Sequence, residues 1–395
     1  MLAERKQSAQ RGEAERSAGG ARPPARRAPL GTGFIFHERY LWHDTRSAAG
    51  FIPAGGMVEP DRHAENPDTK RRFRNLLAVS GLLEKLVEIA PRMASEDEVL
   101  RVHRREYLER VKKLSAENGG DAGVLTPFGP GSYEIALLSA GGALAAVDAV
   151  LDARVQTAYA LIRPPGHHAE ADQGMGFCIF SNAAIAVHHA RAARGLARVA
   201  IVDWDVHHGN GSESAFYADP SVLTISVHQD NYFPAGRGAL EDMGEGAGRG
   251  YNLNVPLPPG SGHGAYEAVF ARVVVPALRR FRPELIVVAS GFDGGAMDPL
   301  GRMLATSATY RSLTRMLVEV AQEVCGGRIA LTHEGGYSTA HVPFCGLAVM
   351  EELSGISTGV VDPFLEFFMA IGGQALQPHQ EAVIRRAEKQ LDLLR

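Results

Sequence analysis

Cysteine is scarce in this chain of 395 residues, which contains only Cys178, Cys325 and Cys345. Their odd number and unpaired spacing suit a reducing compartment better than a disulfide framework. The net charge of −4 gives no general attraction to nucleic acid or to a membrane surface. No uninterrupted apolar stretch approaches the roughly 20 residues of a membrane-spanning helix. We therefore expect a cytoplasmic protein without nucleic acid or membrane partners.

The first thirty residues contain little that is large and apolar, and they are rich in arginine. Such a composition cannot offset the entropy lost on ordering, so residues 1–30 are predicted to form a disordered basic tail. An arginine-rich targeting peptide is the alternative, which the interspersed acidic residues disfavour. Over the whole chain 45% of residues are apolar and 22% charged, a globular balance. With no linker or repeat after residue 31, residues 31–395 are expected to form one domain.

Short apolar segments alternate with helical patterns along this domain. The apolar segments are Ala158–Ile162, Val199–Val202, Val222–Val227, Leu253–Leu257, Leu285–Ala289 and Ile329–Thr332. The helical patterns include Tyr133–Leu151, Asn182–Arg194, Tyr266–Arg280 and Tyr310–Val324. Strands that are apolar on both faces and alternate with helices predict an α/β fold, with a mostly parallel central sheet and helices on both faces.

Polar residues follow five of these strands. They are found at 163–168, 203–210, 226–228, 290–293 and 334–337. In parallel sheets covered by helices, ligands bind outside the carboxyl ends of the strands. The sequence therefore predicts that these five polar segments converge on one functional site.

A candidate metal site lies within these segments. Asp205 and His207 are two residues apart in an extended segment, so both side chains can reach one ion. Asp293, after another strand, would complete three protein ligands and leave zinc one open position for water, as a hydrolase requires. An isolated Asp-x-His pair is usually accidental, and iron, manganese or cobalt would also accept these ligands.

Three further residues are candidates for proton transfer and charge stabilisation. His167 and His168 have ordinary pKa values near neutrality, and the partner of each second ring nitrogen would set its charge. The alternative is that they are loop structure or metal ligands. Tyr337 follows two glycines, and its phenol could donate a hydrogen bond to an oxygen that gains negative charge. The alternative for Tyr337 is a place in the core or at the rim.

Several motifs in the same order resemble the histone deacetylase superfamily. The string Asp-Trp-Asp-Val-His-His-Gly-Asn-Gly at 203–211 is similar to its class II branch, and especially to bacterial histone deacetylase-like amidohydrolases. The other matching motifs are His-Ala-Glu-Asn-Pro at 63–67, Arg-Pro-Pro-Gly-His-His at 163–168, Gly-Met-Gly-Phe-Cys at 174–178, Phe-Pro at 233–234 and Glu-Gly-Gly-Tyr at 334–337. The similarity extends from about residue 33 to at least 343–346.

The resemblance implies an arginase/deacetylase-like fold with a sheet of about eight strands, and a deacetylase catalytic domain over residues 31–395. It assigns Asp205, His207 and Asp293 to one zinc ion per subunit. It also implies that His167 and His168 transfer protons, with His168 deprotonating the attacking water, and that Tyr337 and zinc hold the oxyanion. The implied activity removes acetyl or other short acyl groups from the ε-amine of lysine in peptides or proteins.

The resemblance also implies partners for the two histidines. His167 would pair with Asp203, and His168 would face Asn210, where class I members have aspartate. A structural potassium ion is implied near Asp203 and the hydroxyl of Ser226. An ordinary hydrogen-bonded Asp203 is the alternative.

A substrate tunnel is implied by Gly176, Phe177 and Phe233, whose aromatic rings match the pair that flanks an acyl-lysine chain. Core packing is the alternative for each ring. Leu300 stands where polyamine deacetylases have an acidic gatekeeper, and Asp121 is a candidate for the rim carboxylate that grips substrate amides.

Three rival functions follow from the same resemblance. A two-metal ureohydrolase is disfavoured because Gly209 and Gly295 stand where its second metal needs aspartates. Deacetylation of an acetylpolyamine or another small acetylated amine is the closer alternative, disfavoured by the uncharged Leu300. An inactive acyl-lysine binding protein is less favoured because Tyr337 is present. The loop between His63 and Arg72 resembles a segment used in assembly by bacterial relatives, so a homo-oligomer is expected.

Overall fold

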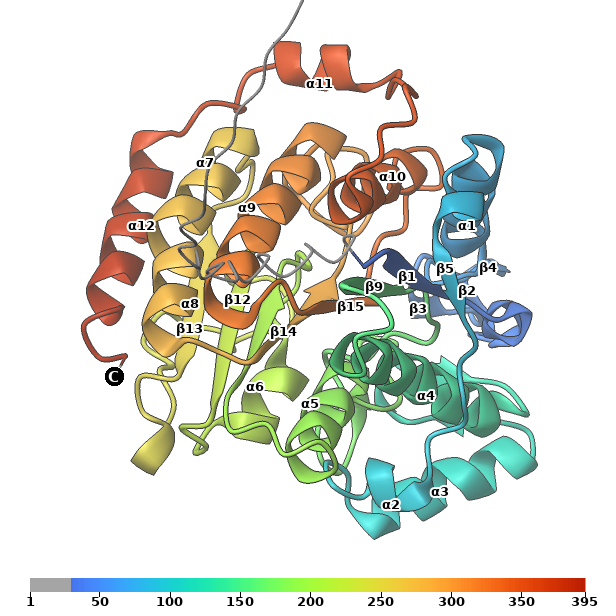
Figure 1. Cartoon of the computed structure of the whole chain (residues 1–395). Helices are drawn as coiled ribbons and strands as arrows, with labels where there is room; N and C mark the ends of the chain where they lie inside the picture. The colour runs from blue at the N-terminus through green and yellow to red at the C-terminus, as the bar shows by residue number, and fades with distance from the viewer. Residues whose placement is uncertain (1–29, 395) are drawn as a thin grey trace, which may run out of the picture.

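A parallel sheet of eight strands forms the centre of the computed structural model, which describes residues 30–394 (Figure 1). The spatial order is β13-β12-β11-β14-β15-β9-β1-β5. The strands are β1 (Thr32–Ile35), β5 (Val87–Ile89), β9 (Thr157–Ala160), β11 (Val199–Asp203), β12 (Val222–Gln229), β13 (Asn252–Leu257), β14 (Leu285–Ser290) and β15 (Ile329–His333). The predicted fold class is confirmed, and the six predicted strands are present. The tail predicted for residues 1–30 lies almost wholly outside the described residues.

Twelve α-helices are described within residues 30–394. They are α1 (Asp68–Val79), α2 (Glu96–Val99), α3 (Arg105–Ala116), α4 (Ser132–Leu151), α5 (Asn182–Ala192), α6 (Asn210–Phe216), α7 (His263–Val269), α8 (Val275–Phe281), α9 (Ser307–Cys325), α10 (Val342–Ser354), α11 (Leu365–Ala370) and α12 (Pro378–Gln390). The helix predicted over 266–280 is interrupted by a π-helical turn at Phe270–Val274. Pro276 has no N–H to donate to the carbonyl four residues earlier, which explains the change of helical pattern.

The alternation of side chains along each strand divides the core into two layers. In β11, Val199 and Ile201 pack with residues of α4, α5 and α6. The intervening Ala200 and Val202 pack with residues of α1, α7, α8, α9, α10 and α12 on the other face. Figure 1 shows α4 and α5 on one side of the sheet and α9 and α10 on the other. Both faces of the sheet are therefore covered, as its apolar strands require.

Helix α4 has the length and composition of a membrane-spanning helix. Its 20 residues are long and apolar enough to cross a membrane, although Glu134 and Asp148 interrupt the apolar run. In the fold, 83% of the qualifying 18-residue window is buried. The helix packs against α5 and against strands β1, β9 and β15. Its apolar character is therefore explained by its place in the core.

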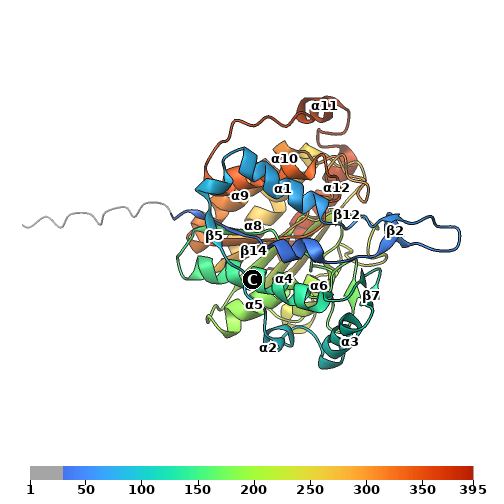
Figure 2. The same cartoon turned by 90° about the vertical axis from the view of Figure 1, so that its right-hand side faces the viewer.

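Two groups of short strands surround the carboxyl edge of the main sheet. The strands β2 (Ser47–Ala49), β3 (Ile52–Pro53) and β4 (Asp61–Arg62) form a small antiparallel sheet, which projects from the body in Figure 2. The strands β6 (Gly120–Asp121), β7 (Gly123–Val124), β8 (Pro127–Phe128) and β10 (Gly174–Met175) pair in two further sheets. The loop expected between His63 and Arg72 ends earlier than predicted, because α1 begins at Asp68.

Candidate active site

The structure brings together the three residues predicted to hold a metal. Asp205 and His207 follow β11, and Asp293 follows the adjacent strand β14. One ligand atom from each lies within 4.8 Å of the others, and Nδ1 of His207 is 3.1 Å from an oxygen of each carboxylate. All three side chains are buried. Two carboxylates and an imidazole are a donor set that fits one divalent cation.

Backbone groups orient both carboxylates of this cluster. The N–H of Gly335 donates to Oδ2 of Asp205 at 2.8 Å, and the N–H of Val206 donates to Oδ1 of Asp293 at 2.8 Å. A Cβ atom at Gly335 would overlap the carboxylate of Asp293, so this close approach requires glycine. Burial and the neighbouring Asp205 raise the pKa of Asp293 to about 6. A bound cation would supply the positive charge that keeps both carboxylates ionised.

A second set of potential ligand atoms lies nearby, in His167, Cys178 and Glu334. The carboxylate of Glu334 is already engaged, however. It accepts the N–H groups of Gly166 and His167 at 2.6 and 3.1 Å and the hydroxyl of Thr332 at 2.9 Å. We therefore place the candidate metal centre at the first set.

The two adjacent histidines have different partners. Nδ1 of His167 is 2.9 Å from Oδ2 of Asp203. Burial opposes protonation of His167, but the carboxylates of Asp205 and Asp203 outweigh it and raise its pKa to about 10. Burial and the positive charge of His167 lower the pKa of His168 well below its usual value. These opposite shifts favour an imidazolium at His167 and a neutral imidazole at His168.

Asn210 also determines which nitrogen of His168 carries the proton. Its amide nitrogen donates to the carbonyl of His168 at 3.2 Å and to Glu170 at 2.9 Å. Its amide oxygen therefore faces Nδ1 of His168, 2.8 Å away, and accepts the hydrogen from that nitrogen. The lone pair of His168 is left on Nε2, where it can take a proton.

Asp203 and Ser226, the pair predicted to lie near potassium, occupy directly paired positions of β11 and β12. Asp203 accepts the N–H of Asp205 at 3.0 Å in addition to its contact with His167. The hydroxyl of Ser226 lies 2.9 Å from Nδ1 of His228. Both side chains have protein partners, and the potassium ion stays a prediction.

An apolar tunnel with a volume of about 160 Å³ reaches His207 in the candidate metal site. It is lined by Phe51, Leu125, His168, Gly176, Phe177, His207, Tyr232, Phe233, Leu300 and Tyr337. The ring of Phe177 meets that of Tyr337 edge to face at a centroid distance of 5.8 Å, and Phe233 meets His168 in the same way at 5.0 Å. Burial raises the pKa of Tyr337 well above its usual value, so its phenol keeps the hydrogen that it can donate.

Four of the five predicted tunnel residues line this cavity, and Asp121 does not. Asp121 is exposed at the end of β6, where its carboxylate accepts the N–H groups of Gly123 and Thr126 at 2.8 and 3.2 Å. The same turn carries Leu125 into the tunnel wall. Asp121 therefore shapes a loop beside the tunnel, and its contact with substrate stays a prediction.

Sequence reasoning missed Phe51, Leu125 and Tyr232 in the tunnel wall. Tyr232 stacks on His207 with ring centroids 5.5 Å apart and an interplanar angle of 12°. Its position next to the Phe-Pro motif at 233–234 could have identified it. Phe51 and Leu125 lie in turns that carry no recognisable motif. Only the folded structure shows that they line the tunnel.

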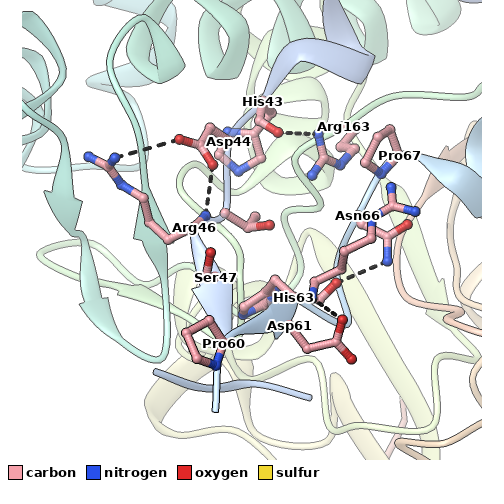
Figure 3. Close-up of a pocket in the computed structure, with 12 residues that line it drawn as sticks. His43, Asp44, Arg46, Ser47, Pro60, Asp61, His63, Asn66, Pro67 and Arg163 are labelled. Carbon is pink, nitrogen blue, oxygen red and sulfur yellow. Dashed lines mark hydrogen bonds and ion pairs between the residues drawn. The ribbon is translucent and has the colours of Figure 1, made fainter. Parts of the chain in front are cut away.

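A larger polar cavity of about 540 Å³ lies beside the projecting β2–β4 sheet (Figure 3). Its walls come from residues 43–47, 60–63 and 66–67, together with Arg163. None of the described residues that line it is a candidate metal ligand or a member of the predicted proton-transfer pair. The chemistry of the site therefore lies in the smaller tunnel.

The fold and the site together define a class of α/β enzymes with a candidate metal centre and paired histidines at the ends of parallel strands. The chain matches the histone deacetylase domain family over residues 63–353. It therefore belongs to the histone deacetylase family, and its activity is that of a deacetylase or amidohydrolase.

Individual relatives agree with this assignment. The chain is 54% identical over 339 residues to a histone deacetylase-like amidohydrolase of Pseudomonas aeruginosa, which covers 85% of this chain and 89% of that protein. It is 36% identical over 324 residues to the human polyamine deacetylase HDAC10, which covers 78% of this chain and 46% of that protein. The crystal structure of the HDA15 HD domain matches with a TM-score of 0.77 at 31% identity, covering 91% of this chain and 96% of that chain.

Proposed function

We propose that this protein is a zinc-dependent amidohydrolase that removes acetyl or other short acyl groups from the ε-amine of lysine in peptides or proteins. The observation that carries the proposal is the apolar tunnel that reaches His207, one of the three clustered candidate ligands Asp205, His207 and Asp293. Its apolar walls favour the methylene stem of an acylated lysine over a charged amine. Zinc held by these three residues would supply a polarised acyl oxygen and a water of lowered pKa.

The residues at the inner end of the tunnel supply proton transfer and charge stabilisation. His168 takes the proton of the attacking water on Nε2, because its Nδ1 hydrogen is held by Asn210. The same nitrogen then returns the proton to the departing amine. His167 stays an imidazolium against Asp203 and stabilises negative charge in the transition state. Tyr337 donates its phenol hydrogen to the oxyanion.

Acetate release tests this proposal. The metal-loaded protein is given an acetyl-lysine peptide, acetylspermidine and a trifluoroacetyl-lysine peptide, and kcat/KM is compared. We expect the peptides to be cleaved best. Y337F should lower kcat on the acetyl-lysine peptide by about 100-fold or more while the metal stays bound, because one oxyanion donor is removed. Unchanged acetate release from Y337F would contradict the role of Tyr337.

Deacetylation of a small acetylated amine is the second candidate, and the similarity to a polyamine deacetylase favours it. The tunnel argues against it, because none of the described residues that line it is acidic and Leu300 occupies the expected gatekeeper position. A second ammonium of a polyamine would therefore find no carboxylate there. A clear preference for acetylspermidine in the comparison above would reverse our choice.

A further inference from the structure

A buried cluster of one carboxylate and two cations lies beside the active site. Glu65 precedes α1, Lys70 lies in the first turn of α1, and Arg163 follows β9. Nζ of Lys70 is 3.0 Å from Oε1 of Glu65, and Nη2 of Arg163 is 2.9 Å from Oε2. The side chains of Lys70, Glu65 and Arg163 are 2%, 1% and 0% exposed, so water contributes almost nothing to their solvation.

Arg163 uses its whole guanidinium within the protein. Nε lies 2.9 and 3.0 Å from the two oxygens of Glu65, and Nη1 donates to the carbonyls of Tyr40 and His43 at 3.1 and 2.6 Å. Figure 3 shows the bond from Arg163 to His43 at the edge of the polar cavity. Arg163 therefore forms a bidentate pair with Glu65, and its bonds to the two carbonyls tie the segment before β2 to the end of β9.

Lys70 shares that one carboxylate, so the cluster carries one more positive than negative charge. The histidines around it do not add to the imbalance. Burial lowers the pKa of His43 to about 3, and burial also lowers the pKa of His63 and of His333. A buried ammonium without a carboxylate of its own is costly unless another group stabilises it.

The aromatic ring of Tyr337 is such a group. Nζ of Lys70 lies 5.9 Å from the centroid of that ring, within the range of a cation–π contact, and such contacts are strongest where water is absent. Phe177 meets the ring edge to face at 5.8 Å. The N–H of Tyr337 donates to Oδ2 of Asp298 at 2.6 Å. Lys70 thus contacts the face of the Tyr337 ring, while Phe177 packs against the ring and Asp298 holds the backbone of Tyr337.

We propose that Lys70 is a positioning residue for Tyr337: it holds the ring in place and keeps a positive charge near the phenol while the oxyanion forms. Lys70 is not among the residues that line the tunnel, so it acts through Tyr337 and never touches the substrate. Glu65, which is itself held by Arg163, fixes the ammonium at this distance. This inference rests on the proposed function, because it takes Tyr337 as the donor to the oxyanion.

A double-mutant cycle tests the inference on the metal-loaded full chain. K70M removes the charge and leaves the bidentate pair of Glu65 and Arg163 balanced. We expect kcat on the acetyl-lysine peptide to fall about 10- to 30-fold with KM within about twofold, since a desolvated cation–π contact is lost. In the Y337F background the same change should alter kcat by less than about twofold, because the ring no longer carries the donor. K85M makes the same substitution at an exposed lysine and should leave kcat unchanged.

The outcomes separate this inference from the proposed function. If the unmodified protein releases no acetate from any of the three substrates, the proposed function fails. If it is active and K70M retains full kcat, only the role of Lys70 fails. An equal loss in both backgrounds would show a merely structural effect and would also overturn it. Should K70M fail to fold, K70Q, which is polar but uncharged, enters the same cycle. Melting temperature and metal content are measured for every variant.

Discussion

Nδ1 of His167 lies 2.9 Å from Oδ2 of Asp203, and this contact helps to give His167 a charge that its neighbour His168 lacks. The two rings are only 3.9 Å apart between centroids, so the positive charge of His167 also opposes protonation of His168. Opposite charge states in adjacent histidines are what the proposed division of labour requires. This relationship leads to a prediction about pH.

We predict that D203N and N210D shift the pH profile of kcat in different ways. The first variant moves the alkaline limb, and the second moves the acid limb. His167 must be charged, so activity is lost as pH rises through its raised pKa. D203N lowers that pKa, and the alkaline limb should move to lower pH. His168 must be neutral, so activity is lost as pH falls through its lowered pKa. N210D should raise that pKa and move the acid limb to higher pH. Unmoved limbs in both variants would contradict the assignment.

Removal of the carboxylate of Glu65 should destabilise the fold. E65Q leaves Lys70 and Arg163 buried without a counter-charge, and we expect the free energy of unfolding to fall by about 3–5 kcal/mol. Burial opposes ionisation of Glu65, but Arg163 and Lys70 outweigh it and lower its pKa. Its contribution is therefore present above the ordinary carboxyl pKa and lost as pH falls through the lowered one.

Urea denaturation at neutral and acidic pH checks this prediction. The difference in unfolding free energy between the unmodified protein and E65Q should shrink in acid. E59Q, the same substitution at an exposed glutamate, is the matched control and should cost less than about 0.5 kcal/mol. A pH-independent difference would mean that the charge of Glu65 is not the source of its effect.

Chelation should remove both activity and part of the stability. Asp205 and Asp293 are fully buried, so a bound cation would offset their repulsion, and loss of metal should lower the melting temperature. Elemental analysis and thermal melts before and after chelation measure the effect. Adding back zinc, iron, manganese or cobalt identifies the metal that restores acetate release. Full activity in metal-free protein would contradict a metal-dependent mechanism.

The tunnel should not tolerate a side chain at Gly176. A Cβ atom there would lie 2.5 Å from Cδ2 of His168 and 2.8 Å from the ring of Phe233, at a φ of +52°. We expect G176A to lower kcat/KM by at least about tenfold, because small misplacements of catalytic groups are costly. Gly236 has a φ of +73° and open space around its Cβ position, so G236A applies a similar backbone strain without the clash. A similar loss in both variants would attribute the effect to strain alone.

An acidic residue at position 300 should change the substrate preference. Leu300 lines the tunnel, and L300E would place a carboxylate where a second ammonium of a polyamine could pair with it. We expect kcat/KM for acetylspermidine to rise relative to the acetyl-lysine peptide by about tenfold, with L300Q as the uncharged control. If L300Q produces the same shift, charge is not the cause.

Much of the site could be predicted from the sequence because its signals are local. Apolar runs on both faces identified six of the central strands, and polar residues directly after them identified where the candidate site lies. Asp205 and His207 share a direction because they are two residues apart in an extended segment. Strands β1 and β5 escaped notice because both are short and β5 is a partly exposed edge strand.

The sequence by itself determined which polar residues converge. They directly follow parallel strands, and the carboxyl ends of such strands meet at one edge of the sheet. Only the tertiary structure decided the charge of each histidine, since that depends on burial and on partners brought from other strands. It also decided that Lys70 lies against the ring of Tyr337, 267 residues further along the chain. No local pattern marks such a contact, because it arises where α1 packs beside the end of β15.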